Sequence, residues 1–385
     1  MKRQSLPMSA LLPTPAETLL LQAALLPGPV AIDAWRTWRQ AVDFDAIDLG
    51  SRRLLPLLFD NLTQQGVQDP ILAKYEGLKK LQWYHNRLLS HQLQSILAAF
   101  AAADLPAMPV KGCALNLLGY FQPGQRPMTD LDIVVPQARA FDAASILESL
   151  GWQFDSTQNR PLTSDEIRFS AHGKFAKGKV LIVELHWESP TQFLRGPAPG
   201  DAWQRSLPAQ FQGHPCRVLN PADQLLHICA HGAAANAIAP IRWAADALAL
   251  IREENIDWPD FVSQAKRHRL VPFVREPLRF LAEKLYAPIP AEIIARLDAA
   301  KLSLAERALA RIMILPETQI GILPAFGRHA FCLNRFSGGR PSLPTIVAYL
   351  KYTLHLQRNG SQFRGLAQAI FRRLKISLRP AARHS

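Results

Sequence analysis

The sequence predicts an α+β fold, in which a small mixed β-sheet is flanked by an N-terminal and a C-terminal helical region. Three patterns support this prediction. Apolar residues recur at helical spacing over residues 1–104, short extended runs alternate with glycine and proline turns over 105–219, and helical spacing returns over 220–316. A basic tail follows over 317–385. With 48% hydrophobic residues, the chain can bury a sizeable core and form one unit with helical additions.

The first region is expected to end in one or two long amphipathic helices over 71–100. Pro106 stops this pattern, and residues 107–110 predict a short strand. A turn at Lys111-Gly112 then leads into a short helix over 114–118.

The centre is predicted to be a mixed α/β unit. We expect a strand over 128–135, a helix over 138–150, a short strand over 152–154, and a hairpin that pairs 167–176 with 180–187. After Asn220 and Pro221, which suit a helix start, the expected helices are 221–231, 241–252, 258–268, 271–284, 291–301 and 304–315. The chain beyond Pro316 has no clear pattern.

Charge is distributed unevenly along the chain. The net charge is +13, and from Gln319 to Ser385 there are eleven lysines and arginines with no acidic residue. Such a tail favours RNA, an anionic membrane face or a polyanionic substrate, although a solvated tail without a partner is an equal alternative. The spread of Trp and Phe through the predicted elements indicates core packing rather than base stacking.

The four cysteines lie apart, without a CxxC pair, which argues against a disulfide framework or a zinc ribbon. They are Cys113, Cys216, Cys229 and Cys332. Because prolines and Glu17 interrupt the apolar N-terminal stretch, we expect neither a signal peptide nor a transmembrane segment, and we expect a cytoplasmic location.

Asp130 and Asp132 give the strongest chemical signal. Alternation along a strand puts these two carboxylates on one face and Leu131 and Ile133 on the other. Carboxylates that share a face repel each other unless a cation lies between them, and Mg²⁺ suits such oxygen ligands. In isolation, however, an Asp pair at a strand start is often a solvated turn.

Two further segments strengthen the metal-site interpretation. Lys111-Gly112 lies between a strand and a helix, where glycine permits a close phosphate approach, although ordinary turns also look like this. Glu184 shares a strand face with His186 in an apolar run, where an acid is costly unless it is paired or binds metal. Glu184 is therefore a third ligand or a general base, with a plain salt bridge as the alternative; Glu188 ranks second.

Three motifs in this order resemble a bacterial group of uncharacterised nucleotidyltransferases in the DNA polymerase β-like superfamily. They are Lys111-Gly112, the Arg126-Pro-Met-Thr-Asp-Leu-Asp132 segment and the Glu184-Leu-His-Trp187 strand. The resemblance covers residues 31–270. The sequence departs from the usual pattern at Cys113, where a serine or glycine is common, and at Glu184, where aspartate is common.

The resemblance implies transfer of a nucleoside monophosphate from a nucleoside triphosphate (NTP) to an acceptor hydroxyl, with release of pyrophosphate. Its ions would be Mg²⁺ or Mn²⁺, held by Asp130, Asp132 and Glu184. Positions Lys111, Gly112 and Arg126 would neutralise the triphosphate, unless Arg126 pairs with an acid. The acceptor is a small molecule, sugar, peptide or RNA.

His227 and His231 are spaced so that they share a helix face, but the HExxH pattern of zinc proteases is absent. We expect them to line a core or a pocket wall. Asp246 is expected to pair with His231 or Arg242, near the cleft by resemblance.

Two other functions remain open at this level. A degenerate, non-enzymatic adaptor would bind nucleotide, RNA or an anionic membrane through the basic tail. A toxin of the nucleotidyltransferase type would modify tRNA and arrest growth.

Overall fold

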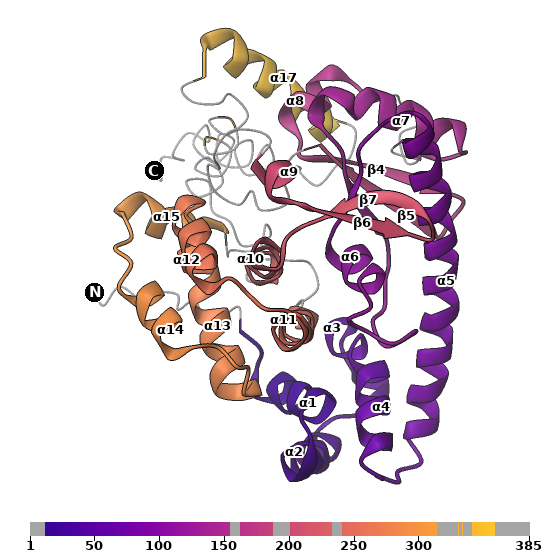
Figure 1. The fold of residues 1–385 in the computed structure, drawn as a ribbon, viewed down its shortest axis with the longest axis vertical. Coiled ribbons are helices and arrows are strands. Elements are labelled where there is room, and N and C mark those ends of the chain that lie inside the picture. The colour runs from indigo at the N-terminus through magenta and orange to yellow at the C-terminus, as the bar shows by residue number, and fades with distance from the viewer. Residues whose placement is uncertain are drawn as a thin grey trace, which may run out of the picture.

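The computed structural model describes residues 12–154, 162–187, 201–232, 241–313, 330, 333 and 341–358. A small mixed sheet lies beside a larger group of helices, which confirms the α+β prediction (Figure 1). Glu188 and most of the basic tail lie outside the described residues, so the expectations for them stay predictions.

The N-terminal region forms four short helices and one long helix. They are α1 (Pro15–Leu25), α2 (Gly28–Ala41), α3 (Leu49–Arg52), α4 (Leu55–Gln64) and α5 (Leu72–Ala102), with a 3₁₀ turn, η2, at Phe44–Ala46. The predicted long helical segment is therefore a single helix of 31 residues. Near its start Tyr75 packs among the helices, whereas Phe100 near its end packs under the sheet, so α5 connects both cores.

The main sheet has five strands in the order β1-β2-β5-β4-β3. The strands are β1 (Met108–Pro109), β2 (Leu131–Val134), β3 (Gln153–Phe154), β4 (His172–Lys177) and β5 (Leu181–His186). Strands β2 and β5 are parallel, and the other three pairs are antiparallel. A separate hairpin of β6 (Leu207–Phe211) and β7 (His214–Val218), which the sequence did not predict, lies against α5.

Four helical segments lie around the sheet, and two of them differ from the sequence prediction. They are α6 (Lys111–Leu117), the 3₁₀ turn η3 (Gln137–Arg139), α7 (Ala140–Ser149) and α8 (Ser164–Phe169). The expected hairpin starts later than predicted, because Thr163 and Glu166 form a capping box that begins α8 where we expected a strand. Lys111 and Gly112 form the first turn of α6 rather than a turn before it.

The C-terminal region is helical, close to the predicted boundaries. It contains α10 (Pro221–Gly232), α11 (Arg242–Glu253), α12 (Trp258–Arg267), α13 (Val271–Leu285), α14 (Ala291–Asp298) and α15 (Leu304–Met313), while the short helix α9 (Asp201–Arg205), which was not predicted, precedes β6. Helix α17 (Leu343–Arg358), which was not predicted, contacts α8 through Phe169 and Tyr349. In the part of the chain that the structure describes, no helix has the length and hydropathy needed to cross a bilayer.

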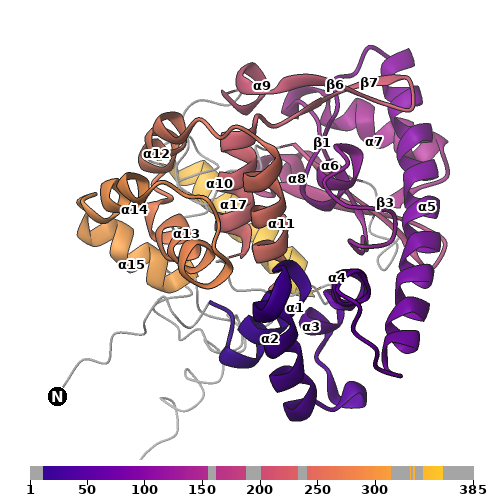
Figure 2. The same ribbon diagram turned by 60° about the horizontal axis from the view of Figure 1, so that its bottom comes forward.

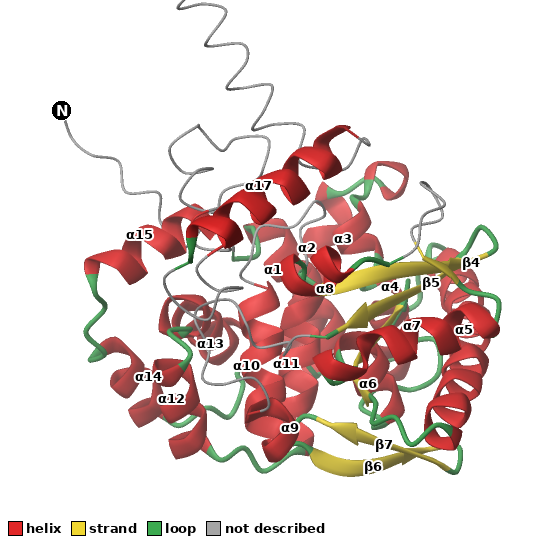
Figure 3. Ribbon diagram, turned by 90° about the horizontal axis from the view of Figure 1, so that it is seen from above, coloured by secondary structure: helices red, strands yellow, loops and turns green. Residues whose placement is uncertain are grey.

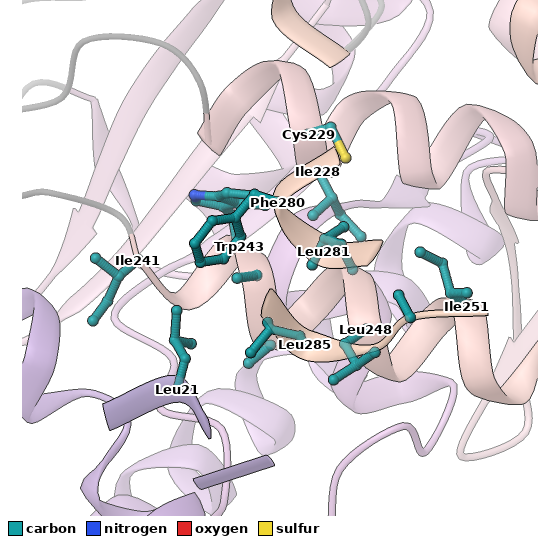
Figure 4. Packing of buried hydrophobic residues seen from close by; sticks show 14 of the residues in the cluster. Leu21, Ile228, Cys229, Ile241, Trp243, Leu248, Ile251, Phe280, Leu281 and Leu285 are labelled. Carbon is teal, nitrogen blue, oxygen red and sulfur yellow. The ribbon is translucent and has the colours of Figure 1, made fainter. Parts of the chain in front are cut away.

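Helices from both ends of the chain share one hydrophobic core. Leu21 of α1 belongs to the same cluster as Trp243 of α11 and Phe280 of α13 (Figure 4). The turned view shows α1 beside α11 and α13 (Figure 2). Gly232 permits a close approach of α10 and α11, because a Cβ there would overlap the Trp243 side chain.

The sheet packs its buried face on a second cluster, which includes α5 and α7. Leu131, Ile133, Val183 and Leu185 are fully buried there, and the helices α10 and α11 lie on the other side of the sheet (Figure 3). The opposite parity of Asp132 and Glu184 therefore turns their side chains away from this core and toward the helical region.

Candidate active site

Asp132 and Glu184 lie opposite each other on the parallel strands β2 and β5. His186 Nε2 is 3.0 Å from Asp132 Oδ1 and 3.7 Å from Glu184 Oε2. One ligand atom from each of these three residues lies within 4.8 Å of the others, a spacing that suits a single metal ion. Acids from the two predicted segments thus meet at one place.

Asp130 precedes β2 at a bend, and it lines a cavity that Asp132 and Glu184 also line. Burial raises the pKa of its carboxyl, and the negative charges of Asp132 and Glu184 raise it further. The Thr129 hydroxyl donates a hydrogen bond of 3.1 Å to Asp130. The three predicted carboxylates are therefore close enough to repel one another, which is the condition that a divalent cation relieves.

Lys111 supplies the positive charge between these acids. Its Nζ is 2.6 Å from Asp132 Oδ1 and 3.5 Å from Glu184 Oε2. Burial opposes the charged form of Lys111, but the two carboxylates outweigh it and raise the pKa of the ammonium. Burial likewise opposes ionisation of Asp132, yet Lys111 and His186 hold the pKa of that carboxyl far below its usual range.

The backbone of Lys111 has a φ of +52°, in the left-handed region that lysine rarely adopts. Strained conformations of this kind concentrate at functional sites. The strain accompanies the turn from Val110, whose N–H donates to the Asp132 carbonyl, into α6. It brings the lysine side chain onto the carboxylates instead of into solvent.

The structure places Arg126 in a buried ion pair. Its Nε and Nη2 each donate a 2.7 Å hydrogen bond to the Asp246 carboxylate, and Arg126 is only 2% exposed. Its Nη1 lies over Gly112, where a Cβ would collide with it. Gly112 therefore makes room for the guanidinium, a role beyond the predicted approach of phosphate.

Asp246 is held by Arg126, a partner that the sequence did not indicate. Because Arg126 precedes β2 and Asp246 lies on α11, this pair fastens the sheet region to the helical region. Bidentate pairs with arginine fix geometry as well as charge.

These groups line one cavity of about 590 Å³ between the sheet and the helices. His227 and His231 of α10 line it too, as expected. Burial lowers the pKa of His227 well below its usual value and that of His231 to about 4, so both are neutral near pH 7. Arg53 and Arg242 also reach this cavity.

Two histidines without a predicted role, His186 and His172, lie beside the acids. His186 shares the Glu184 face of β5, and this strand parity is the sequence signal for its place beside the acids. His172 on β4 packs against His186, with ring centroids 5.0 Å apart.

Acids from parallel strands of a small mixed sheet thus face a cavity lined with cations, an arrangement that suits the binding of a metal ion and of phosphate groups. Comparison with family models identifies the family of the chain. The chain belongs to a family described as uncharacterised nucleotidyltransferase, whose model matches residues 49–286. No curated protein and no solved structure matches the chain.

Proposed function

We propose that the protein transfers a nucleoside monophosphate from an NTP to an acceptor hydroxyl and releases pyrophosphate. Membership of the nucleotidyltransferase family supports the reaction class. The observation that carries the proposal is the register of Asp132 with Glu184, together with Asp130, at a cavity large enough for a nucleotide. A cytoplasmic location, where NTPs are abundant, belongs to the same proposal.

The donor groups fit a hard divalent cation. Asp130, Asp132 and Glu184 offer carboxylate oxygens, which Mg²⁺ and Mn²⁺ prefer. When bound, such an ion would polarise the α-phosphate and neutralise the charge that develops on its oxygens. His186 holds Asp132 Oδ1 and so orients the carboxylate toward the cavity.

The other residues position the substrates. Lys111 lies beside the carboxylates and is placed to contact an α-phosphate oxygen, while Gly112 at the start of α6 makes room for the Arg126 guanidinium beside it. The acceptor oxygen attacks the α-phosphorus, the bond to the bridging oxygen of the β-phosphate breaks, and pyrophosphate leaves. The Glu184 side chain is more exposed than that of Asp132, and Glu184 is placed to take the proton from the acceptor hydroxyl.

Arg126 contributes less to phosphate binding in this proposal than the family resemblance implied. Two of its three nitrogens are engaged with Asp246, so that only Nη1 remains for a phosphate oxygen. The main contribution of Arg126 is then to position α11 against the sheet.

Incubation with each of the four α-labelled NTPs, Mg²⁺ or Mn²⁺ and cell lysate tests the proposal. We expect the label to enter one class of acceptor, which its sensitivity to nuclease, protease or phosphatase identifies. Asp132→Asn should abolish labelling, whereas Asp142→Asn, an exposed acid on α7, should not change it. Absence of labelling with every nucleotide would contradict the proposal.

Thermal unfolding separates an enzyme from an adaptor. A ligand that binds the folded state raises the midpoint of unfolding, by an amount that grows with the logarithm of its concentration relative to its Kd. We expect stabilisation by nucleotide only when metal is present. Equal stabilisation with and without metal, and no labelled product, would favour the adaptor instead.

A further inference from the structure

Away from the proposed metal site, the cavity wall has more positively charged side chains than acidic ones. Three guanidinium groups line it, those of Arg53, Arg126 and Arg242, and one separate carboxylate, Asp246, lies among them. Asp246 is already engaged by Arg126 through both oxygens. Two arginines therefore lack a counter-charge in this wall of the cavity.

Arg242 and Arg53 are weakly held by the protein. Arg242 Nη1 donates a 2.8 Å hydrogen bond to the Pro127 carbonyl, and no ion pair is formed by Arg242 within the described chain. Arg53 follows α3, where its backbone N–H caps the helix, and its side chain makes no hydrogen bond or ion pair with the described residues. Both side chains are partly exposed, and both line the cavity.

The electrostatics show that these charges are neighbours. Burial lowers the pKa of Arg242 to about 9, and the positive charges of Arg126 and Arg53 contribute to the decrease. Asp130 opposes this effect, which places Arg242 within electrostatic reach of the metal-binding acids. Arg126 adds a buried Nη1 without a hydrogen-bond partner in the ranges that the structure describes. An anion bound here would reduce the repulsion among the three guanidinium groups and would accept hydrogen bonds from them.

We propose that Arg53 and Arg242 bind the β- and γ-phosphates of the NTP, as a polyphosphate subsite next to the carboxylates. This inference rests on the proposed function and adds the residues that hold the leaving group. Guanidinium groups donate paired hydrogen bonds that match phosphate oxygens. As Arg53 follows α3 and Arg242 begins α11, a bound polyphosphate would also link the N-terminal helices to the C-terminal helices.

The subsite would determine how many phosphates the enzyme requires. A nucleoside monophosphate has no groups for Arg53 and Arg242, whereas a triphosphate engages both. Inorganic tripolyphosphate has the same charged oxygens without the nucleoside. The phosphate of an acceptor is the other source of such an anion, and it would bind independently of the number of phosphates on the nucleotide.

Isothermal titration calorimetry with Arg53→Gln and Arg242→Gln tests this assignment. The probes are the α,β-methylene analogue of each NTP, the matching monophosphate and inorganic tripolyphosphate, all with Mg²⁺. Arg52→Gln and Arg252→Gln are matched controls, because they remove exposed arginines of the same two helical segments that lie outside the cavity. Arg242→Lys retains the charge and serves if the glutamine variant fails to fold.

We expect each cavity variant to weaken binding of the triphosphate analogue and of tripolyphosphate by about tenfold or more, the usual effect of losing a charged hydrogen bond. Monophosphate affinity and both controls should stay at the wild-type value. Unchanged triphosphate affinity in both variants, or an equal loss for mono- and triphosphate, would overturn the inference and leave nucleotidyl transfer untouched. Arginine-dependent binding of tripolyphosphate without binding of any NTP would support the subsite and overturn the proposed function.

Discussion

Asp132 on β2 lies opposite Glu184 on β5, and Lys111 Nζ contacts both carboxylates, at 2.6 Å and 3.5 Å. The parallel register makes this arrangement possible, because matched positions of neighbouring parallel strands point to the same side of the sheet. An ammonium group thus lies among acids that suit a divalent cation. This relationship leads to the first two predictions.

Asp132→Asn should weaken metal binding by at least 10- to 100-fold, since that is the range for losing groups that merely orient a ligand. The amide keeps the shape of the side chain but removes the charge that a cation needs. Electron paramagnetic resonance of Mn²⁺ measures the free ion directly. The exposed variant Asp142→Asn is the control, and equal Mn²⁺ affinity in both variants would exclude Asp132 as a ligand.

Lys111→Ala and Lys111→Gly should both tighten binding of Mn²⁺ alone, because the competing ammonium charge is removed. Of the two, the glycine variant should be more stable by about 1 kcal/mol, since glycine adopts the left-handed backbone at this position without a Cβ penalty. Urea denaturation measures that difference. Equal stability of the two variants would show that the φ of +52° is not maintained in solution.

Gly112→Ala should destabilise the protein by about 1–3 kcal/mol, because the new methyl group occupies the space of the Arg126 guanidinium. The matched change is Gly77→Ala in α5, where the Cβ meets open space. There the higher helix propensity of alanine should stabilise the protein by about 0.5–1 kcal/mol. Chemical denaturation of both variants compares the signs, and a neutral Gly112→Ala would contradict the close contact.

The environment of Asp260 predicts part of the loss of folding stability at low pH. Burial opposes its ionisation, but hydrogen bonds from Arg205 and Gln264 outweigh burial and lower its pKa. A carboxyl whose pKa is lower in the folded state stabilises the fold above its unfolded pKa of about 3.9, and this contribution disappears as pH falls through the folded value.

Asp260→Asn should therefore lower the melting temperature at pH 7 but flatten its decrease between about pH 5 and the lower, folded pKa. Scanning calorimetry across this range measures both effects. Asp33→Asn, at an exposed surface pair, should leave the profile unchanged. A wild-type slope in Asp260→Asn would mean that Arg205 does not lower the pKa of this carboxyl in solution.

Local sequence signals determined the elements that depend on neighbouring residues. Helical spacing located α5, Asn220 and Pro221 marked the start of α10, and strand alternation put Asp132 on one face and Ile133 on the other. Alternation equally put Glu184 and His186 on one side of β5. These features follow from propensity and period, which act over a few residues. The capping box at Thr163 was also readable, but the apolar run after it was mistaken for a strand.

Only the tertiary structure decided which residues from distant segments meet. The pairing of β2 with β5, the ion pair of Arg126 with Asp246, and the approach of Arg53 to Arg242 each join segments that have no local relation. Strand order and helix packing depend on how the whole hydrophobic surface is buried, which no short window of sequence contains. The sequence by itself thus determined the acids and the face each one occupies, and the packing of both helical regions on the sheet decided which cations face them.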